Sequence, residues 1–461
     1  MYFRSFFDDQ LAHMSYLIGC QRTGQALVID PARNIEPYLE TAKKEGFQIT
    51  AATETHIHAD YLSGARELAH HFGAKLYVSD EGDKDWKYAY VEHYDHELLT
   101  EGSTFSIGNI HFEVLHTPGH TPESISFLLT DKGGGANEPM GIFTGDFLFV
   151  GDVGRPDLLE KAAGVTGTSE SGAKQMFASL RKLEKLSEFL QVWPAHGAGS
   201  ACGKSLGAVP MSTLGYEKKF NWAFQIKEEE QFVEELLAGQ PEPPKYFAMM
   251  KKLNKEGPAL LRKEKTAKIS LSEAGNAVVV DTRPADEFAA GHEAGTINIP
   301  YNGSFTNWAG WLLSYERDIV LIANPEQLAD IEKSLQSIGL DQVTGYVDPK
   351  ELGGSMERYE EIHADKAKRL MEDDQYYAID VRNQSEWDSG HIPGAHHIML
   401  GILPDRLESI PKDKNIIVHC QSGARSAIGA SLLQSKGFKN VLNLEGGFDA
   451  WEKEGLPVKK D

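Results

Sequence analysis

Histidines and acids recur in four short motifs in the first half of the chain, each next to an apolar stretch. The motifs are Thr55-His56-Ile57-His58-Ala59-Asp60, Thr117-Pro118-Gly119-His120-Thr121, Thr144-Gly145-Asp146 and Pro194-Ala195-His196-Gly197. Imidazole nitrogens and carboxylate oxygens are ligands of transition metals, and alternate side chains of an extended segment point to one side. A single histidine is more often a hydrogen-bonded structural residue, but the four motifs together predict a metal site.

A reactive sulfur is predicted near the other end of the chain. The apolar stretch Asn415-Ile416-Ile417-Val418-His419 leads into Cys420-Gln421-Ser422-Gly423-Ala424-Arg425-Ser426. A cysteine between a strand and the start of a helix is surrounded by backbone N–H groups, which stabilise a thiolate or a charged sulfur attached to it. We therefore predict that Cys420 is a nucleophile. Arg425, Ser422 and Gly423 are predicted to bind the anionic sulfur.

The elements that position these groups are predicted to form three domains. Residues 1–240 mix short apolar strands with helices, which indicates a layered α/β domain. A proline-rich stretch follows, and we predict a linker over 241–264. Beyond it, apolar strands alternate with helices as in parallel sheets, which predicts α/β domains at 265–360 and 361–461.

An internal repeat supports the division of the second half into two copies of one unit. Asp281, Arg283, Glu287, Gly291, His292 and Gly295 recur at a constant offset of 99 as Asp380, Arg382, Glu386, Gly390, His391 and Gly394. Aligning the strands that follow puts Ala323 opposite Cys420, and no cysteine lies between Cys202 and Cys420. The first copy is therefore predicted to keep the fold without a thiol nucleophile.

Composition excludes several classes of function. The 461 residues include 46 Lys and Arg against 68 Asp and Glu, a net charge of −22, which disfavours nucleic acids and anionic membranes. No apolar run approaches the roughly 18 residues of a membrane span. The three cysteines lie far apart in the sequence, which argues against a disulfide framework and favours a reducing, cytoplasmic setting.

The histidine and aspartate motifs of residues 1–240 resemble those of the metallo-β-lactamase superfamily. The resemblance implies an αββα sandwich with a metal site at the mouth between its two sheets. Two-metal hydrolases of the superfamily have H-x-H-x-D-H, and here Tyr61 stands at the last position. This leaves His56, His120 and Asp146 as the strongest ligand set. Two imidazoles and one carboxylate suit non-haem Fe(II) with open positions.

Within the superfamily the sequence is similar to persulfide dioxygenases, which implies a single Fe(II) on His56, His120 and Asp146. His58, Asp60 and His196 are then expected around these ligands, where they orient them or hold water, or as a second metal site. Three further residues are substrate-binding candidates: Arg155, Cys202 and Lys204. Arg155 either binds an anionic group of a thiol carrier or makes a structural ion pair. Cys202, beside Lys204, is either a thiol of lowered pKa near the substrate or a packed small residue.

The loop after Cys420 resembles that of rhodanese sulfurtransferases, because four residues separate Cys420 from Arg425 whereas cysteine phosphatases have five. The order of the domains resembles the persulfide dioxygenase–rhodanese fusions of bacterial sulfide detoxification. That resemblance implies oxidation of a low-molecular-weight thiol persulfide by O2 to sulfite, and a rhodanese step that forms or consumes thiosulfate. It also implies a homo-oligomer, a dimer or a tetramer.

Two alternatives stay open at this point. One is a dinuclear zinc hydrolase of thioesters, similar to glyoxalase II, with a sulfurtransferase appendage. The other is a carrier or sensor that relays sulfur through Cys202 and Cys420 without catalysis. The thiol carrier is equally open between glutathione, coenzyme A, bacillithiol and cysteine.

Overall fold

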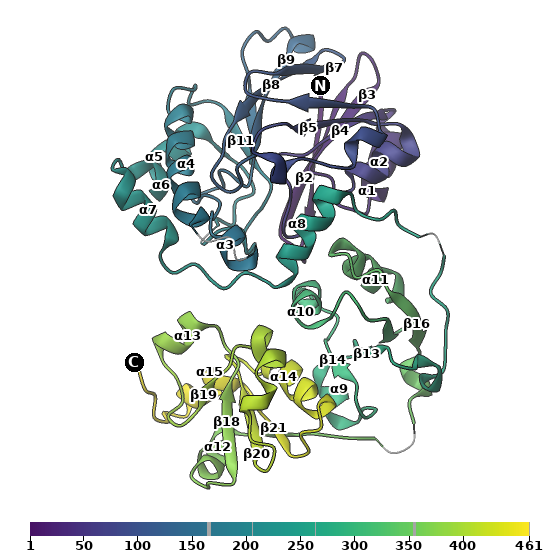
Figure 1. The fold of residues 1–461 in the computed structure, drawn as a ribbon, viewed down its shortest axis with the longest axis vertical. Helices are drawn as coiled ribbons and strands as arrows, with labels where there is room; N and C mark the ends of the chain where they lie inside the picture. The colour runs from purple at the N-terminus through teal and green to yellow at the C-terminus, as the bar shows by residue number, and fades with distance from the viewer. Residues whose placement is uncertain (164–166, 205, 263, 354–355, 461) are drawn as a thin grey trace. The chain divides into compact units, whose positions relative to one another are not determined.

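The computed structural model describes residues 1–163, 167–204, 206–262, 264–353 and 356–460. The chain forms two compact units, Met1–Arg262 with Gln336–Gly339 and Lys263–Leu335 with Leu340–Asp461 (Figure 1). The predicted linker contains residue 263, and the two predicted domains after it contain residues 354–355 and 461. These residues lie outside the described ones.

Two six-stranded sheets form the centre of the first unit. One sheet has the order β1-β2-β3-β4-β5-β6, with strands Tyr2–Asp8, His13–Cys20, Gln25–Ile29, Gln48–Thr53, Lys75–Ser79 and His96–Leu99. The other has the order β12-β11-β10-β9-β8-β7, with β7 to β12 at Thr104–Ile107, Ile110–His116, Ile125–Asp131, Gly141–Gly145, Gln191–Pro194 and Ser212–Thr213. Tyr16, Phe127, Phe143 and Trp193 are buried in the core shared by both sheets.

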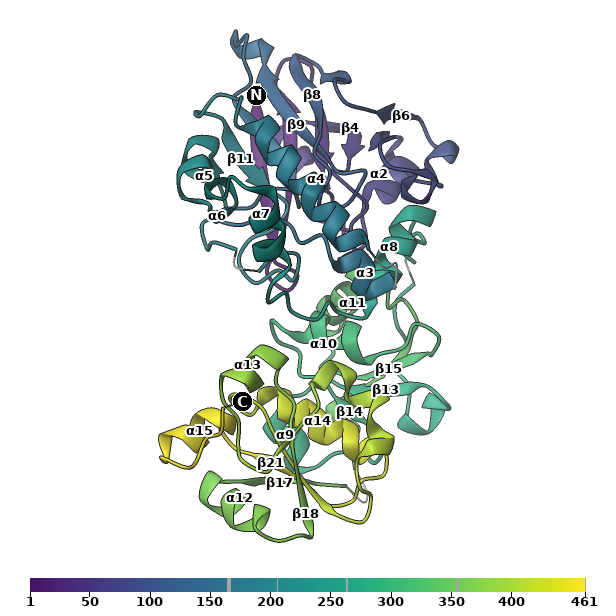
Figure 2. The same ribbon diagram turned by 60° about the vertical axis from the view of Figure 1, so that its left-hand side comes forward.

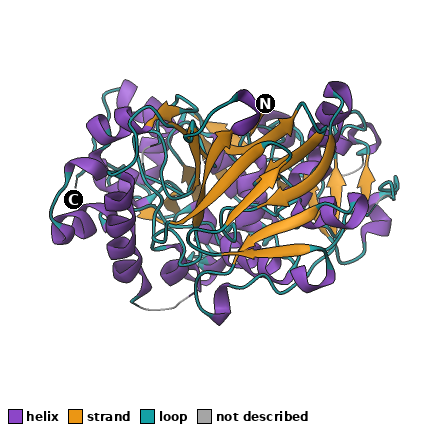
Figure 3. Cartoon of the chain, turned by 90° about the horizontal axis from the view of Figure 1, so that it is seen from above, coloured by secondary structure: helices purple, strands orange, loops and turns teal. Residues whose placement is uncertain are grey.

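Helices cover the outer face of each sheet (Figure 3). Against the first sheet lie α1 (Glu36–Glu45) and α2 (Ala65–Phe72), through a second apolar core. Figure 2 shows the long helix α4 crossing the second sheet. The helical layer on this side comprises α3 (Leu158–Ala163), α4 (Thr168–Leu183), α5 (Leu214–Phe220), α6 (Trp222–Gln225) and α7 (Glu229–Leu237). The layers are therefore helix, sheet, sheet, helix, which confirms the predicted αββα sandwich.

The helix α8 (Tyr246–Glu256) lies where a linker was predicted. Its apolar face is buried, including Phe247 and Met250. The Asn254 side-chain amide donates hydrogen bonds to the backbone oxygens of His58, at 2.8 Å, and Tyr61, at 2.7 Å. The segment predicted as a linker over 241–264 therefore contains an amphipathic helix, which follows the prolines and packs on the first unit.

The second unit contains two parallel sheets. The four-stranded sheet has the order β14-β13-β15-β16, with β13 to β16 at Val278–Asp281, Ile297–Asn298, Ile319–Ile322 and Val343–Val347. Its helices are α9 (Ala285–Ala290), α10 (Phe305–Leu312) and α11 (Leu328–Ser337). The five-stranded sheet has the order β17-β21-β20-β18-β19, with β17 to β21 at Glu360–Ile362, Tyr376–Asp380, His396–His397, Asn415–His419 and Val441–Leu444. Its helices are α12 (Ala364–Met371), α13 (Gln384–Ser389), α14 (Ala424–Ser435) and α15 (Gly447–Lys453).

The sequence repeat corresponds to repeated contacts in these two sheets. Arg283 Nη2 lies 2.6 Å from Asp281 Oδ2 and donates to the Gly291 oxygen at 3.1 Å. Arg382 Nη2 makes the matching bonds to Asp380 Oδ2, at 2.8 Å, and to the Gly390 oxygen, at 2.7 Å. The repeated residues thus hold the end of a strand against the turn after the following helix in both sheets.

The strand register fixes which residues of the two copies correspond. Asp281 pairs with Ile322 across β13 and β15, and Asp380 pairs with His419 across β18 and β20. The next residue is Ala323 in one copy and Cys420 in the other, as the alignment of the strands predicts. In the part of the chain that the structure describes, no helix combines the length and the apolar character that a membrane span requires.

Candidate metal centre and sulfur-transfer loop

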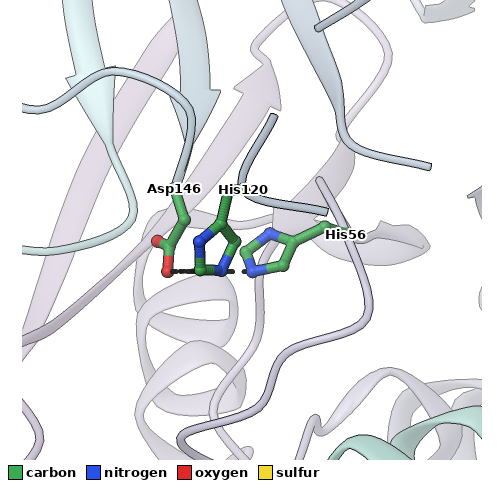
Figure 4. Close-up of side chains that lie close together, drawn as sticks. All are labelled: His56, His120 and Asp146. Atoms are coloured by element: carbon green, nitrogen blue, oxygen red, sulfur yellow. Dashed lines mark ion pairs between the residues drawn. The ribbon is translucent and has the colours of Figure 1, made fainter. Parts of the chain in front are cut away.

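Three buried side chains from both sheets of the first unit meet at one point. His56 follows β4, His120 lies between β8 and β9, and Asp146 comes directly after β10. Asp146 Oδ2 lies 3.7 Å from His56 Nε2 and 3.5 Å from His120 Nε2 (Figure 4). One ligand atom from each residue lies within 4.8 Å of the others. The structure therefore brings together the three residues that the sequence predicts as metal ligands.

Hydrogen bonds orient both imidazoles toward this point. His120 Nδ1 donates to the Arg155 backbone oxygen at 2.9 Å, and His56 Nδ1 donates to Thr55 Oγ1 at 3.0 Å. Burial lowers the pKa of both rings, so each is neutral and has a lone pair at Nε2. Within the described residues, His56 Nε2 and Asp146 Oδ2 are buried without a hydrogen-bond partner. Unpartnered buried atoms of this kind fit a bound cation.

His58 lies beside these ligands but contacts a different carboxylate. Its Nε2 donates to Asp30 Oδ1 at 3.1 Å, and Asp30 Oδ2 accepts the Thr55 hydroxyl at 3.0 Å. Thr55 in turn accepts the bond from His56. Burial alone would lower the pKa of His58, but Asp30 raises it. His58 is therefore linked to the candidate ligand His56 through Asp30 and Thr55.

His196 lies between two carboxylates. Its Nδ1 donates to Asp146 Oδ1 and its Nε2 donates to Asp60 Oδ2, each at 2.6 Å. Burial opposes a charge on the ring, but Asp146 and Asp60 raise the pKa of His196 well above its usual range. Burial would also raise the pKa of Asp146, but His196 holds it well below the usual range. The His196 ring is therefore an imidazolium between two carboxylates, and the second oxygen of Asp146, Oδ2, is left to face His56 and His120.

Cys202 joins Asp60 and His196 in a second group whose ligand atoms lie within 4.8 Å of one another. The segment Gly199-Ser200-Ala201-Cys202 directly follows the His196 turn, from which the sequence predicts that Cys202 lies near the metal site. Burial, Asp60 and Asp146 raise the pKa of the Cys202 thiol well above its usual range. The Lys204 ammonium lies 3.6 Å from Glu235. Of the two roles that the sequence leaves open for Cys202, its burial favours the packed small residue.

Arg155 is a buried structural cation. Its Nε and Nη2 donate to both oxygens of Asp157 at 2.7 and 2.6 Å, and Nη2 also donates to the Pro241 oxygen at 2.6 Å. The side chain is fully buried. Of the two roles that the sequence leaves open, the geometry favours the ion pair. Its effect on the metal site comes through its backbone oxygen, which accepts the His120 bond.

A cavity of about 370 Å³ is lined in part by His120, one of the three candidate ligands. Gly119, Trp86, Lys251 and residues of the first turns of α4 also line it. No local motif marks Lys251 in the sequence, and only the packing of α8 brings it to this cavity.

Cys420 lies at the end of β20, at the start of the loop that leads into α14. Its buried Sγ accepts hydrogen bonds from the Gly423 backbone N–H at 3.1 Å and the Ser426 hydroxyl at 3.5 Å. Ser422 is exposed on the same loop. Arg425 makes a two-bond ion pair with Glu386 at 2.7 and 2.6 Å. The loop thus surrounds the sulfur with donors, and Glu386 fixes the guanidinium beside it.

Comparisons with known proteins agree with this architecture. The family model of the metallo-beta-lactamase superfamily matches residues 8–196, and that of the rhodanese-like domain matches residues 363–454. The second match covers one of the two copies of the repeat. A crystal structure of a metallo-beta-lactamase from Staphylococcus aureus subsp. aureus COL is similar, with 47% identity, a TM-score of 0.70, and coverage of 75% of this chain and 98% of that chain.

Two curated relatives match different parts of the chain. A sulfurtransferase of Allochromatium vinosum is 37% identical over 92 residues, which is 20% of this chain and 86% of that protein. The hydroxyacylglutathione hydrolase GloC of Haemophilus influenzae is 27% identical over 210 residues, which is 42% of this chain and 85% of that protein. The chain therefore belongs to the metallo-β-lactamase superfamily and carries a rhodanese-like domain in its C-terminal part.

Proposed function

We propose that the chain is a persulfide dioxygenase coupled to a sulfurtransferase. The first reaction is R–S–SH + O2 + H2O → R–SH + SO3²⁻ + 2 H⁺, in which the terminal sulfur is oxidised and O2 is reduced. The observation that carries the proposal is the ligand set of His56, His120 and Asp146. Two neutral imidazoles and one carboxylate face a common point, while His58 is bound to Asp30 and His196 is bound to Asp60 and to the other oxygen of Asp146.

This donor set fits a single ferrous ion. Non-haem Fe(II) sites of oxygenases use two histidines and one carboxylate on one face, which leaves the remaining positions open. Held by these three residues, Fe(II) would supply the redox chemistry with O2 and an attachment point for the persulfide sulfur. This arrangement favours one iron per chain, because both nitrogens of His196 in the second group already donate to carboxylates.

The protein's own groups prepare the site. The Arg155 oxygen fixes the His120 ring, and the Asp30–Thr55 pair fixes the His56 ring. His196 takes up Asp146 Oδ1 and so leaves Oδ2 to the ion. Because all three ligands are buried, the reacting atoms are shielded from bulk water, which strengthens the electrostatic interactions among them.

The second reaction takes place at Cys420. In it the thiolate attacks a sulfane sulfur, the S–S bond of the donor breaks, and a cysteine persulfide forms. Transfer to sulfite then follows Cys–S–S⁻ + SO3²⁻ → Cys–S⁻ + S2O3²⁻, and the reverse forms the persulfide from thiosulfate. The Gly423 N–H and the Ser426 hydroxyl stabilise the anionic sulfur in either direction. Residues 265–360 are a copy of this domain without the thiol.

Oxygen uptake by iron-loaded protein tests the first reaction. We expect O2 consumption and sulfite release in equal amounts with a low-molecular-weight persulfide, and loss of both in His120→Ala. Cys420→Ser is the matched control, and it should keep sulfite formation. No oxygen uptake with persulfides of cysteine, glutathione, bacillithiol or coenzyme A would overturn the proposal.

A dinuclear zinc hydrolase is the second candidate, and the group of Asp60, His196 and Cys202 is the observation that favours it. The similarity to hydroxyacylglutathione hydrolase GloC points the same way. Against it, Tyr61 provides no imidazole, and both nitrogens of His196 donate to carboxylates. Two zinc ions per chain together with thioester hydrolysis would establish this candidate instead.

A further inference from the structure

The cavity beside His120 contains a lysine that no hydrogen bond or ion pair engages within the described residues. Lys251 projects from α8, and its Nζ lies 3.4 Å from the centre of the Trp86 ring. The side chain is half-buried, and burial lowers the pKa of its ammonium to about 8. A partly desolvated cation with an aromatic ring on one side and a cavity on the other has room for an anionic partner.

The charged groups around Lys251 divide into two sets. The first set is Glu123, which is fully buried and whose Oε1 accepts a hydrogen bond from the Ile57 backbone N–H at 2.8 Å. Asp83 and Asp85 are exposed and also line the cavity. Lys255 Nζ lies 3.8 Å from Asp85 Oδ1. The cavity therefore has a cation within it and two carboxylates at its solvent-exposed edge.

The lining next to the metal centre is small and weakly polar. Gly119 and Gly172 face each other, so that a Cβ at Gly172 would lie 2.9 Å from the Gly119 oxygen. A side chain at Gly172 would therefore collide with the backbone in this part of the cavity wall. His120 also lines the cavity, so a molecule bound there can direct a sulfur atom to this residue.

Resting on the proposed function, we propose that this cavity binds an amino-acid-type thiol carrier, with its carboxylate on the Lys251 ammonium and its persulfide directed to His120. Asp83 and Asp85 then face the ammonium group of the same carrier. A cavity of about 370 Å³ accommodates an amino acid or a small peptide. The two aspartates repel the phosphates of coenzyme A, which disfavours that carrier.

Paired substrates that differ only in the carboxylate test the proposal. Cysteine persulfide has the carboxylate, and cysteamine persulfide is the same molecule without it. In Lys251→Gln we expect the KM for cysteine persulfide to rise about tenfold at unchanged kcat, and the KM for cysteamine persulfide to stay the same. Lys251→Arg should retain the preference. Lys252→Gln, which removes an exposed neighbouring charge, should match the wild type.

A binding measurement separates this proposal from the proposed function. Calorimetric titration of cysteine and of cysteamine into the protein should show a weaker affinity for cysteine alone in Lys251→Gln. If this difference appears while no persulfide supports oxygen uptake, the carboxylate site stands and the dioxygenase proposal fails. If oxygen uptake is normal and Lys251→Gln changes both substrates equally or neither, the carboxylate site is overturned.

Discussion

The two copies of the repeat share a framework and differ at the end of one strand. Both hold an aspartate at a strand end with an arginine that also contacts a glycine oxygen. In the second copy the neighbouring strand leads to Cys420, and Arg425 follows five positions later. In the first copy the same positions are Ala323 and Leu328.

This comparison shows that framework and chemistry occupy separate residues. The arginine and aspartate stabilise the strand ends, and they do so whether or not a reactive sulfur is present. The loop after β20 adds the sulfur, its N–H donors and a guanidinium held by Glu386. A sulfurtransferase site therefore depends on a few loop residues over a framework that persists without them.

Loss of the nucleophile should have the largest effect. We expect Cys420→Ser to reduce sulfur transfer from thiosulfate by roughly 10⁴-fold or more, since a hydroxyl does not form the persulfide. Transfer to cyanide, followed by thiocyanate formation, measures it. Oxygen uptake in the same variant should be unchanged, and residual transfer near the wild-type rate would assign the reaction to another residue.

Removal of the framework arginine should come next. Arg382→Met leaves the buried Asp380 carboxylate without its partner, which costs about 3–5 kcal/mol in the free energy of unfolding. Arg382 also donates to Gln421 at 3.0 Å and lies over the Phe448 ring at 4.1 Å, so sulfur transfer should fall as well. Urea unfolding and a transfer assay measure the two effects.

The matched variant Arg283→Met tests the same contact in the first copy. It should destabilise the protein by less, because this arginine is more exposed, with 14% of its side chain accessible against 2% for Arg382. Sulfur transfer should not change. A loss of transfer equal to that of Arg382→Met would contradict the separation of framework from chemistry.

The pH dependence of the free energy of unfolding should reveal the lowered pKa of Asp380. Burial alone would raise the pKa of this carboxyl, but His419 and the bonds from Arg382 hold it below its ordinary value. Its stabilising contribution is therefore fully present above the ordinary aspartate pKa of about 4 and is lost as the pH falls through the lowered folded-state value. The difference in unfolding free energy between the wild type and Asp380→Asn should shrink as the pH falls below about 4. A difference that grew in acid would refute the lowered pKa.

Restoring only a thiol to the first copy should have the smallest effect. Ala323→Cys places a sulfur where Cys420 lies in the second copy, but Leu328 stands where Arg425 does. In a Cys420→Ser background, we expect transfer to remain at the background level. Measurable transfer in the double variant would show that the thiol alone limits the first copy.

Local patterns predicted the groups that depend on neighbours in sequence. The four motifs lie at strand ends or turns, so they indicated residues that meet at the candidate metal centre. The constant offset of the repeat indicated matching sheets. The Cys420 loop was visible for the same reason, because a strand, a glycine and a helix follow one another directly. In each case the chemistry depends on backbone geometry within a few residues.

Contacts between segments far apart in the sequence could not be predicted from local patterns. The bonds from α8 to the segment after His56, and the place of Lys251 beside Trp86, join residues more than 150 positions apart. Burial, with Asp60 and Asp146, raises the pKa of the Cys202 thiol, and these two carboxylates come from segments remote from Cys202 in the sequence. Arg155 was ambiguous, since only the fold shows that it is fully buried against Asp157.

The metal content of the purified protein, measured together with its oxygen consumption, tests the central claim most directly. The account predicts a single iron in each chain and oxygen uptake with a persulfide in proportion to that iron. In Asp146→Ala it predicts the loss of both the bound iron and the oxygen uptake. Protein that instead holds two zinc ions and hydrolyses thioesters without consuming oxygen would contradict it.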